Sequence, residues 1–109
     1  MTKFIAEELS LDQVSLVRPL LARIVRVDKS LGDQLRRSLS SVTLNLSEGN
    51  GRVGADRVHM FRTAYASNRE VKSSLRLAVR YGYVADADIA PILRHNHHLG
   101  GFIHGLMTK

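Results

Sequence analysis

The chain has 109 residues, of which 44% are hydrophobic and 24% are charged, and this length and mixture indicate one folded domain rather than a disordered chain or a membrane protein. It contains no cysteine, which excludes disulfides, thiolate metal sites and cysteine nucleophiles. Sixteen Lys and Arg against ten Asp and Glu give a formal net charge of +6, so polyanions are the first partners to consider.

The N-terminal part of the chain changes character at residue 10. Residues 1–9 have weak periodicity and are expected to form a loose arm; their early acids are unlike a secretory signal, which predicts a cytoplasmic protein. Ser10 with Gln13 matches a capping box, and apolar residues then recur at helical spacing over about residues 11–27. Pro19 lies inside this helix, so a kink or a restart is expected there.

Three further helices follow. After a polar break at residues 28–30, apolar spacings of three and four predict a second helix over about residues 31–48. A glycine-rich loop separates it from a third helix, which is expected to begin near residue 55 or 56 and to stop at Gly82. Asp88 is the expected N-cap of the last helix, because Pro91 then falls in the first turn.

Four amphipathic helices with short connections and no convincing strand predict an all-α fold. We expect an antiparallel up-down four-helix bundle, with residues 1–109 as a single domain. Some apolar residues are not needed by the four stripes and are expected to be buried between subunits. These residues are Leu16, Leu20, Leu44, Leu77 and Phe102.

The glycine-rich loop, residues 49–54, spells the G-x-G-x-x-G motif of dinucleotide-binding folds. Val42, Leu44 and Leu46 before it alternate as a strand would, and Glu70 follows at the distance of a ribose-binding acid. However, residues 55–81 are continuously helical in pattern and nothing after Gly82 indicates a strand. The favoured interpretation is therefore a structural loop that binds no nucleotide.

Neither the acids nor the histidines have the spacing of a metal or catalytic motif. Glu48 and Glu70 lie near apolar faces, but neither begins a Glu-x-x-His pair, so hydrogen bonds or ion pairs are expected instead. Four histidines lie on the last helix in two face-sharing pairs, His95 with His98 and His97 with His104. We expect a solvated or interface face here, and no catalytic residue, metal or cofactor.

The basic residues of the third helix give the most specific signal. Spacings of seven and four align four of them in one stripe, Arg62, Arg69, Arg76 and Arg80. Together with Lys72 on the same helix, and with Arg36 and Arg37 on the second helix, they form the predicted nucleic-acid-binding surface. A solvated face, or salt bridges to another subunit, is the competing interpretation. With only six aromatic residues in the chain (three Tyr and three Phe), a base-stacking platform for single strands has little support.

Residues 33–38, DQLRRS, and residues 41–52, SVTLNLSEGNGR, carry a family resemblance. With the Ser67 and Glu70 pair that follows, the chain resembles the small bacterial bundle proteins named for intervening sequences in 23S ribosomal RNA genes, some of which are labelled ribosomal proteins. The resemblance implies an up-down bundle, a homopentamer around a central channel and a basic surface for nucleic acid. Accessory proteins of diversity-generating retroelements look similar in fold and partner a reverse transcriptase. No catalytic residues of the family are established.

The sequence therefore favours a non-enzymatic, oligomeric helical bundle that binds RNA or DNA through Arg-rich helix faces. The alternative is an assembly adaptor whose partner is another protein, such as a reverse transcriptase.

Overall fold

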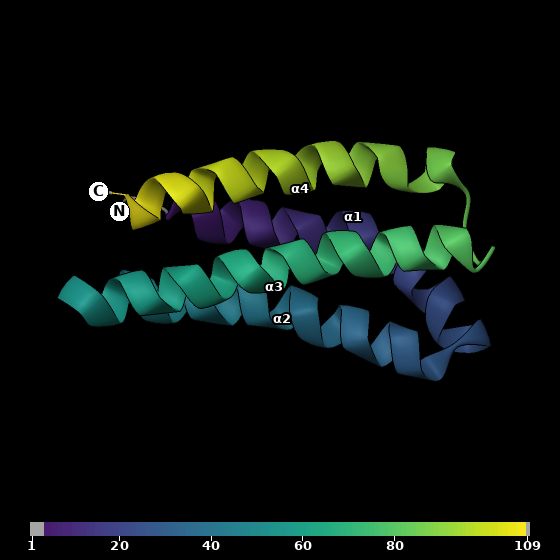
Figure 1. The fold of residues 1–109 in the computed structure, drawn as a ribbon, viewed down its shortest axis with the longest axis horizontal. Coiled ribbons are helices and arrows are strands. Elements are labelled where there is room, and N and C mark those ends of the chain that lie inside the picture. The colour runs from purple at the N-terminus through teal and green to yellow at the C-terminus, as the bar shows by residue number, and fades with distance from the viewer. Residues whose placement is uncertain (1–3, 109) are drawn as a thin grey trace.

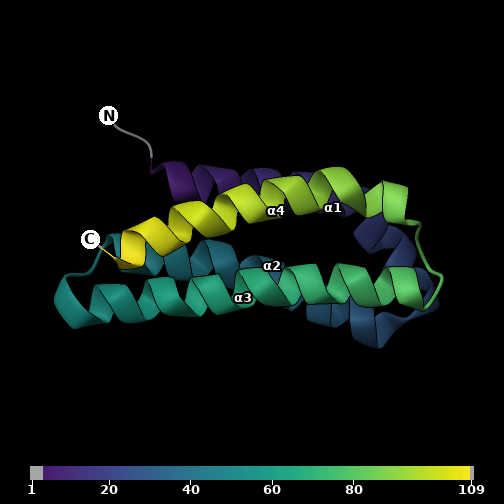
Figure 2. The ribbon, with the colours of Figure 1, turned by 45° about the horizontal axis from the view of Figure 1, so that its top comes forward.

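The computed structural model describes residues 4–108 and confirms the all-α four-helix bundle. Its helices are α1 (Ile5–Val27), α2 (Lys29–Asn50), α3 (Gly54–Arg80) and α4 (Asp86–Met107). Consecutive helices run in opposite directions, and α1 begins near the end of α4 (Figures 1 and 2). Helices α1 and α3 each pack against both α2 and α4, in a body that measures 43 × 24 × 23 Å. None of these helices has a stretch long and apolar enough to cross a membrane.

Helix α1 begins earlier than the sequence predicts, so the expected loose arm is wrong for residues 5–9; residues 1–3 lie outside the described part of the chain. Tertiary contacts hold this first turn, because Ala6 is buried and the Phe4 ring lies 6.1 Å from the Phe61 ring. The predicted capping box is also wrong. Ser10 lies inside α1, where its hydroxyl donates to the Glu7 carbonyl oxygen at 2.6 Å. The helix continues through Pro19, which is exposed, so it does not restart there.

Aspartates organise the start of α2 and of α4. Asp28 Oδ1 accepts the Leu31 N–H at 3.0 Å and so caps α2, although the sequence suggested only a polar break. Helix α4 begins at Asp86 rather than after Asp88. Asp88 Oδ2 accepts the Ala85 N–H at 2.9 Å, which is the reaching-back half of a capping box.

The glycine-rich segment has a structural role, because close packing requires a glycine at one of its positions and backbone conformation requires one at another. Gly49 belongs to α2 and is buried, and a Cβ added there would lie only 2.6 Å from Phe61 Cε1. Gly54 has a φ of +62°, whereas Gly51 has a φ of −90° and needs no glycine on that ground. Arg57 Nη1 donates to the carbonyl oxygens of Gly49 and Asn50 at 3.2 and 3.3 Å, which satisfies the end of α2.

One correction concerns the five apolar residues that the sequence assigned to subunit contacts rather than to the core. Leu20 belongs to the core and is only 7% exposed. The other four remain on the surface, one on each helix, at 41% to 64% exposure: Leu16, Leu44, Leu77 and Phe102.

Candidate functional site

A polar groove of about 500 Å³ lies between α3 and α4 near the middle of the bundle. Three cations from α3 line it, Arg69, Lys72 and Arg76, and none of the residues described along its walls is acidic. His97 and His104 of α4 line the opposite wall. Two neighbouring helices thus surround one concavity with positive or protonatable side chains, and such a concavity attracts anions.

The floor of this groove is a buried network of three side-chain amides from α1, α3 and α4. Gln13 Nε2 donates to Asn68 Oδ1 at 3.1 Å, and Asn96 Nδ2 donates to Gln13 Oε1 at 2.8 Å. Asn68 Nδ2 in turn donates to the Asn96 carbonyl oxygen at 3.0 Å. Asn68 and Asn96 are 3% and 4% exposed, and both line the groove. The network fixes the relative positions of the helices that form the groove.

The α4 wall of the groove has little side-chain bulk, because two of the residues that form it are glycines. A Cβ added at Gly100 would lie 3.4 Å from Asn68 Nδ2, whereas a Cβ added at Gly101 would meet nothing within 4 Å. Rings lie at the end of the groove where Tyr65 and His104 meet, with their centroids 6.1 Å apart and their planes inclined by 55°. The groove therefore has open space beside α4 and two ring faces at one end.

The structure separates the predicted nucleic-acid-binding residues into two groups. The five predicted residues that belong to α3 are all exposed, and we call them the cationic flank of α3: Arg62, Arg69, Lys72, Arg76 and Arg80. Arg36 and Arg37 are exposed on α2 and do not line the groove. Between the two groups lies a polar contact, in which Gln34 Nε2 donates to Glu70 Oε2 at 3.0 Å.

The cationic flank is also free of ion pairs within the described residues, as are several cations elsewhere on the surface. The ion pairs among residues 4–108 join Arg23 to Asp88, Lys29 to Asp33, and Arg52 to both Glu48 and Asp56. No member of the cationic flank takes part in any of them. Its five positive charges are therefore not neutralised by the described residues of the same subunit.

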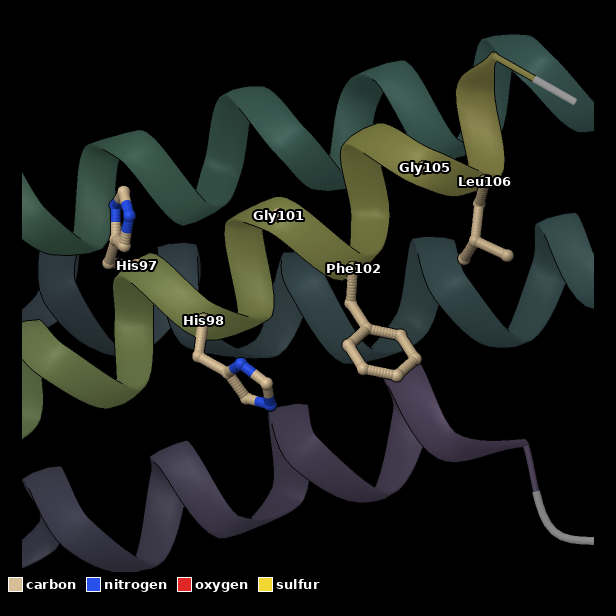
Figure 3. Close-up of a pocket in the computed structure, with 6 residues that line it drawn as sticks. All are labelled: His97, His98, Gly101, Phe102, Gly105 and Leu106. Carbon is tan, nitrogen blue, oxygen red and sulfur yellow. The ribbon is translucent and has the colours of Figure 1, made fainter.

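The α4 histidines divide between two faces, as their spacing predicts. Figure 3 shows His97 turned towards α3 and His98 turned towards α1, with Gly101 and Gly105 further along α4. His95 Nε2 lies 2.7 Å from the Leu9 carbonyl oxygen, which ties α4 to α1. No three His, Asp or Glu side chains in the described range come together as a metal site.

The two glutamates make an ion pair and a hydrogen bond as predicted, but they do so at the surface rather than in the interior. Glu48 pairs with Arg52 at 3.3 Å, and Glu70 accepts the bond from Gln34. Both carboxylates belong to exposed residues, so neither is a buried acid that needs a metal or a catalytic partner.

Shifted pKa values occur away from the groove. A hydrogen bond from Lys29 Nζ to Asp33 Oδ2 lowers the pKa of that carboxyl group. The Tyr83 hydroxyl donates to Asp28 Oδ2 at 2.9 Å, and this bond raises the pKa of the Tyr83 phenol. The first bond lies within the first turns of α2, and the second joins the α3–α4 connection to the N-cap of α2; neither Asp33 nor Tyr83 lines the groove.

The sequence did not identify the groove itself. It placed Gln13 in a cap and did not connect it with Asn68 or Asn96, whereas the three amides bond to one another. The available signal was that each occupies a core position of its own helix.

Comparisons with known proteins agree with this architecture. The family described as 23S rRNA-intervening sequence protein matches residues 8–105. A crystal structure from Bacteroides thetaiotaomicron, of a protein with unknown function from the S23 ribosomal protein family, has a TM-score of 0.86 at 19% identity. The match covers 95% of this chain and 99% of that one, and it shows a shared fold. No curated protein matches the chain significantly.

Proposed function

Because this chain belongs to the 23S rRNA-intervening sequence protein family, we propose that it is a non-enzymatic, self-associating bundle that binds nucleic acid through the cationic flank of α3. The observation that carries the proposal is the set of five exposed cations on one helix, none of them in an ion pair among residues 4–108. Arg suits this role because its guanidinium group matches the geometry of phosphate oxygens.

The rigidity of α3 supports the same proposal. The flank runs from Arg62 to Arg80 on one uninterrupted helix, and a helix rises about 1.5 Å per residue. The cations are therefore held along a line roughly 27 Å long, which is enough to contact several consecutive phosphates. Contacts of this kind give affinity without base specificity, and each one adds salt dependence.

The decisive experiment reverses part of the flank. Arg62→Glu, Arg69→Glu and Arg76→Glu together lower the formal charge by two for each substitution, from +6 to 0. Wild-type binding to structured RNA is expected to weaken steeply between low and physiological salt, and the triple variant is expected to lose at least about 100-fold in affinity at low salt. Fluorescence anisotropy at several salt concentrations measures both effects.

A matched control separates the flank from overall charge. Arg18, Arg26 and Arg94 are also exposed and take part in none of the ion pairs described above, and they lie on α1 and α4. Their reversal to Glu produces the same net charge and is expected to weaken binding much less. Equal losses in both triple variants, with helicity and oligomer size unchanged, would refute the assignment to α3. An additional Arg36→Glu, Arg37→Glu variant tests whether the surface extends onto α2.

Self-association is the second part of the proposal. Leu16, Leu44, Leu77 and Phe102 are exposed on four different helices, so a ring that buries them uses two different faces of each subunit, as head-to-tail contacts do. The family resemblance favours five subunits. Sedimentation is expected to give a species several times 12.2 kDa, and a strict monomer at micromolar concentration would contradict this part alone.

A further inference from the structure

The groove between α3 and α4 has features that an electrostatic surface for duplexes does not need. A surface that only tracks phosphates requires exposed cations and nothing below them. Here Arg69, Lys72 and Arg76 border a concavity of about 500 Å³, which lies within the range of roughly 300–1,000 Å³ found for pockets that hold small ligands. A concavity of this size accommodates about one nucleotide unit.

The floor of the groove offers a hydrogen-bond acceptor. Asn96 Nδ2 donates to Gln13 Oε1, to the Asn68 carbonyl oxygen and to Asn68 Oδ1, at 2.8 to 3.1 Å, and these three acceptors fix the orientation of the amide. Asn96 Oδ1 accepts no hydrogen bond from residues 4–108 in this arrangement. Because no fully buried side-chain oxygen or nitrogen in that range lacks a partner, Oδ1 has access to solvent, and Asn96 lines the groove. The free oxygen is thus available to a donor on a ligand.

The walls complete the site. Helices α3 and α4 run antiparallel (Figure 1). The Tyr65 and His104 rings meet at one end of the groove, and Arg76 lies about three turns further along α3, towards the other end. Bases stack on Tyr and His rings when they are unpaired, so this groove brings together ring faces that the low aromatic content of the chain did not predict. The bare backbone at Gly101 leaves open space beside α4, since a Cβ there would meet nothing within 4 Å. One groove therefore combines cations, an acceptor, ring faces and room for a chain.

We propose that this groove binds single-stranded RNA, with phosphates on Arg69, Lys72 and Arg76 and a ribose hydroxyl on Asn96 Oδ1. The inference rests on the proposed nucleic-acid function and names its substrate class. The 2′-hydroxyl is the donor that distinguishes RNA from DNA. A DNA strand in the groove would displace water from Asn96 Oδ1 without supplying a donor in its place, so the site is expected to favour RNA. An unpaired strand is required because the bases of a duplex are not available to the rings.

Substitutions of two α4 glycines provide the test. Gly101 lines the groove, whereas Gly105 lies one turn further along α4 and does not, and a Cβ at either position would meet nothing within 4 Å. Gly101→Glu places a carboxylate beside the bound phosphates and is expected to weaken binding of labelled oligouridylate at least about tenfold, because like charges repel strongly at an interface. Gly105→Glu carries the same charge change and is expected to change affinity less than about twofold.

The choice of probe tests the chemistry of the ligand. Oligouridylate and oligodeoxyuridylate differ only in the 2′-hydroxyl, so wild type is expected to bind the former more tightly. A hairpin RNA can still contact the exposed cations, but it is expected to compete less well than unlabelled oligouridylate, because its paired bases do not enter the groove. If Gly101→Glu and Gly105→Glu lose affinity equally, or if neither loses affinity, the groove is not the binding site, even if charge reversal on the α3 flank abolishes binding. Better competition by the hairpin, or equal affinity for the two oligonucleotides, would also overturn the proposal. If reversal of the flank leaves binding unchanged, the underlying function fails as well.

Discussion

Helix α3 has two flanks, and its polar side chains are arranged differently on each. On the α2 side they pair within the subunit: the Ser67 and Ser41 hydroxyls lie 2.7 Å apart, and Glu70 accepts a bond from Gln34 at 3.0 Å. On the α4 side the cations that border the groove make no ion pair among the described residues. The first flank is thus satisfied by the fold itself, and the second is left able to bind a ligand.

The same contrast appears in the glycines that face α3. Gly49 of α2 lies against Phe61, so closely that a Cβ would be 2.6 Å from the ring. Gly101 of α4 borders open space. Glycine on the closed flank permits tight packing, whereas on the open flank it maintains a groove. Replacing each glycine by alanine is therefore expected to have opposite effects: a loss of stability at Gly49 and a gain at Gly101.

The largest effect is expected below the groove. Asn68→Leu removes the amide that bonds to both Gln13 and Asn96, and it leaves the Gln13 Nε2 and the Asn96 carbonyl oxygen without these partners. Each unsatisfied buried polar group costs about 1–3 kcal/mol, so two such groups are expected to lower the free energy of unfolding by about 2–6 kcal/mol. Urea denaturation at fixed protein concentration measures the change.

A second variant distinguishes the loss of partners from the loss of packing. Replacing Gln13, Asn68 and Asn96 together by Leu removes donors and acceptors at once, and such replacements are often nearly neutral. The triple variant is therefore expected to be more stable than Asn68→Leu. If it is less stable, the hydrogen bonds are not what the single substitution disturbs.

Gly49→Ala tests the closed flank. Phe61 is fully buried, so its ring must shift within a packed core to admit a new methyl group, and overpacking of this kind costs about 1–3 kcal/mol. Thermal unfolding is expected to show a clear decrease in Tm. Unchanged stability would mean that α2 and α3 separate easily, which contradicts the tight flank described above.

Some parts of the molecule are determined locally, by the spacing of residues within one helix. The helices and their buried faces follow from apolar spacings of three and four, because each helix must cover one stripe. The stripe of Arg62, Arg69, Arg76 and Arg80 is predictable for the same reason, since it depends only on the geometry of one helix.

The early start of α1 and the groove depend instead on contacts between distant segments. Residues 5–9 have weak periodicity, yet Phe4 packs near Phe61 and so holds the first turn. The groove requires that Asn96 and Gly101 of α4 come opposite particular residues of α3. That register is set by packing over the whole bundle, and no spacing within one helix specifies it.

Gly101→Ala tests the open flank with the same substitution used at Gly49. The new methyl group meets nothing within 4 Å, and Ala is favoured over Gly inside a helix by about 0.5–1 kcal/mol. The variant is therefore expected to be more stable than wild type in the same urea measurement. A loss of stability would show that the space beside Gly101 is filled in the native assembly.

The smallest effect is expected where the α3–α4 connection contacts the start of α2. The Tyr83 hydroxyl donates to Asp28 Oδ2, and this bond raises the pKa of the phenol above its ordinary value, which is about 10. A pKa raised by folding means that the bond stabilises the fold below about pH 10 and is lost as the pH rises through the folded-state value. Tyr83→Phe is therefore expected to be slightly less stable than wild type at neutral pH, and this difference should disappear in urea titrations above pH 10.

Asp28→Asn keeps an acceptor for the Leu31 N–H but removes the charge, so it should reduce the pH dependence without unwinding α2. A stability difference between wild type and Tyr83→Phe that stays constant across this pH range would show that the phenol contributes through packing rather than through its hydrogen bond.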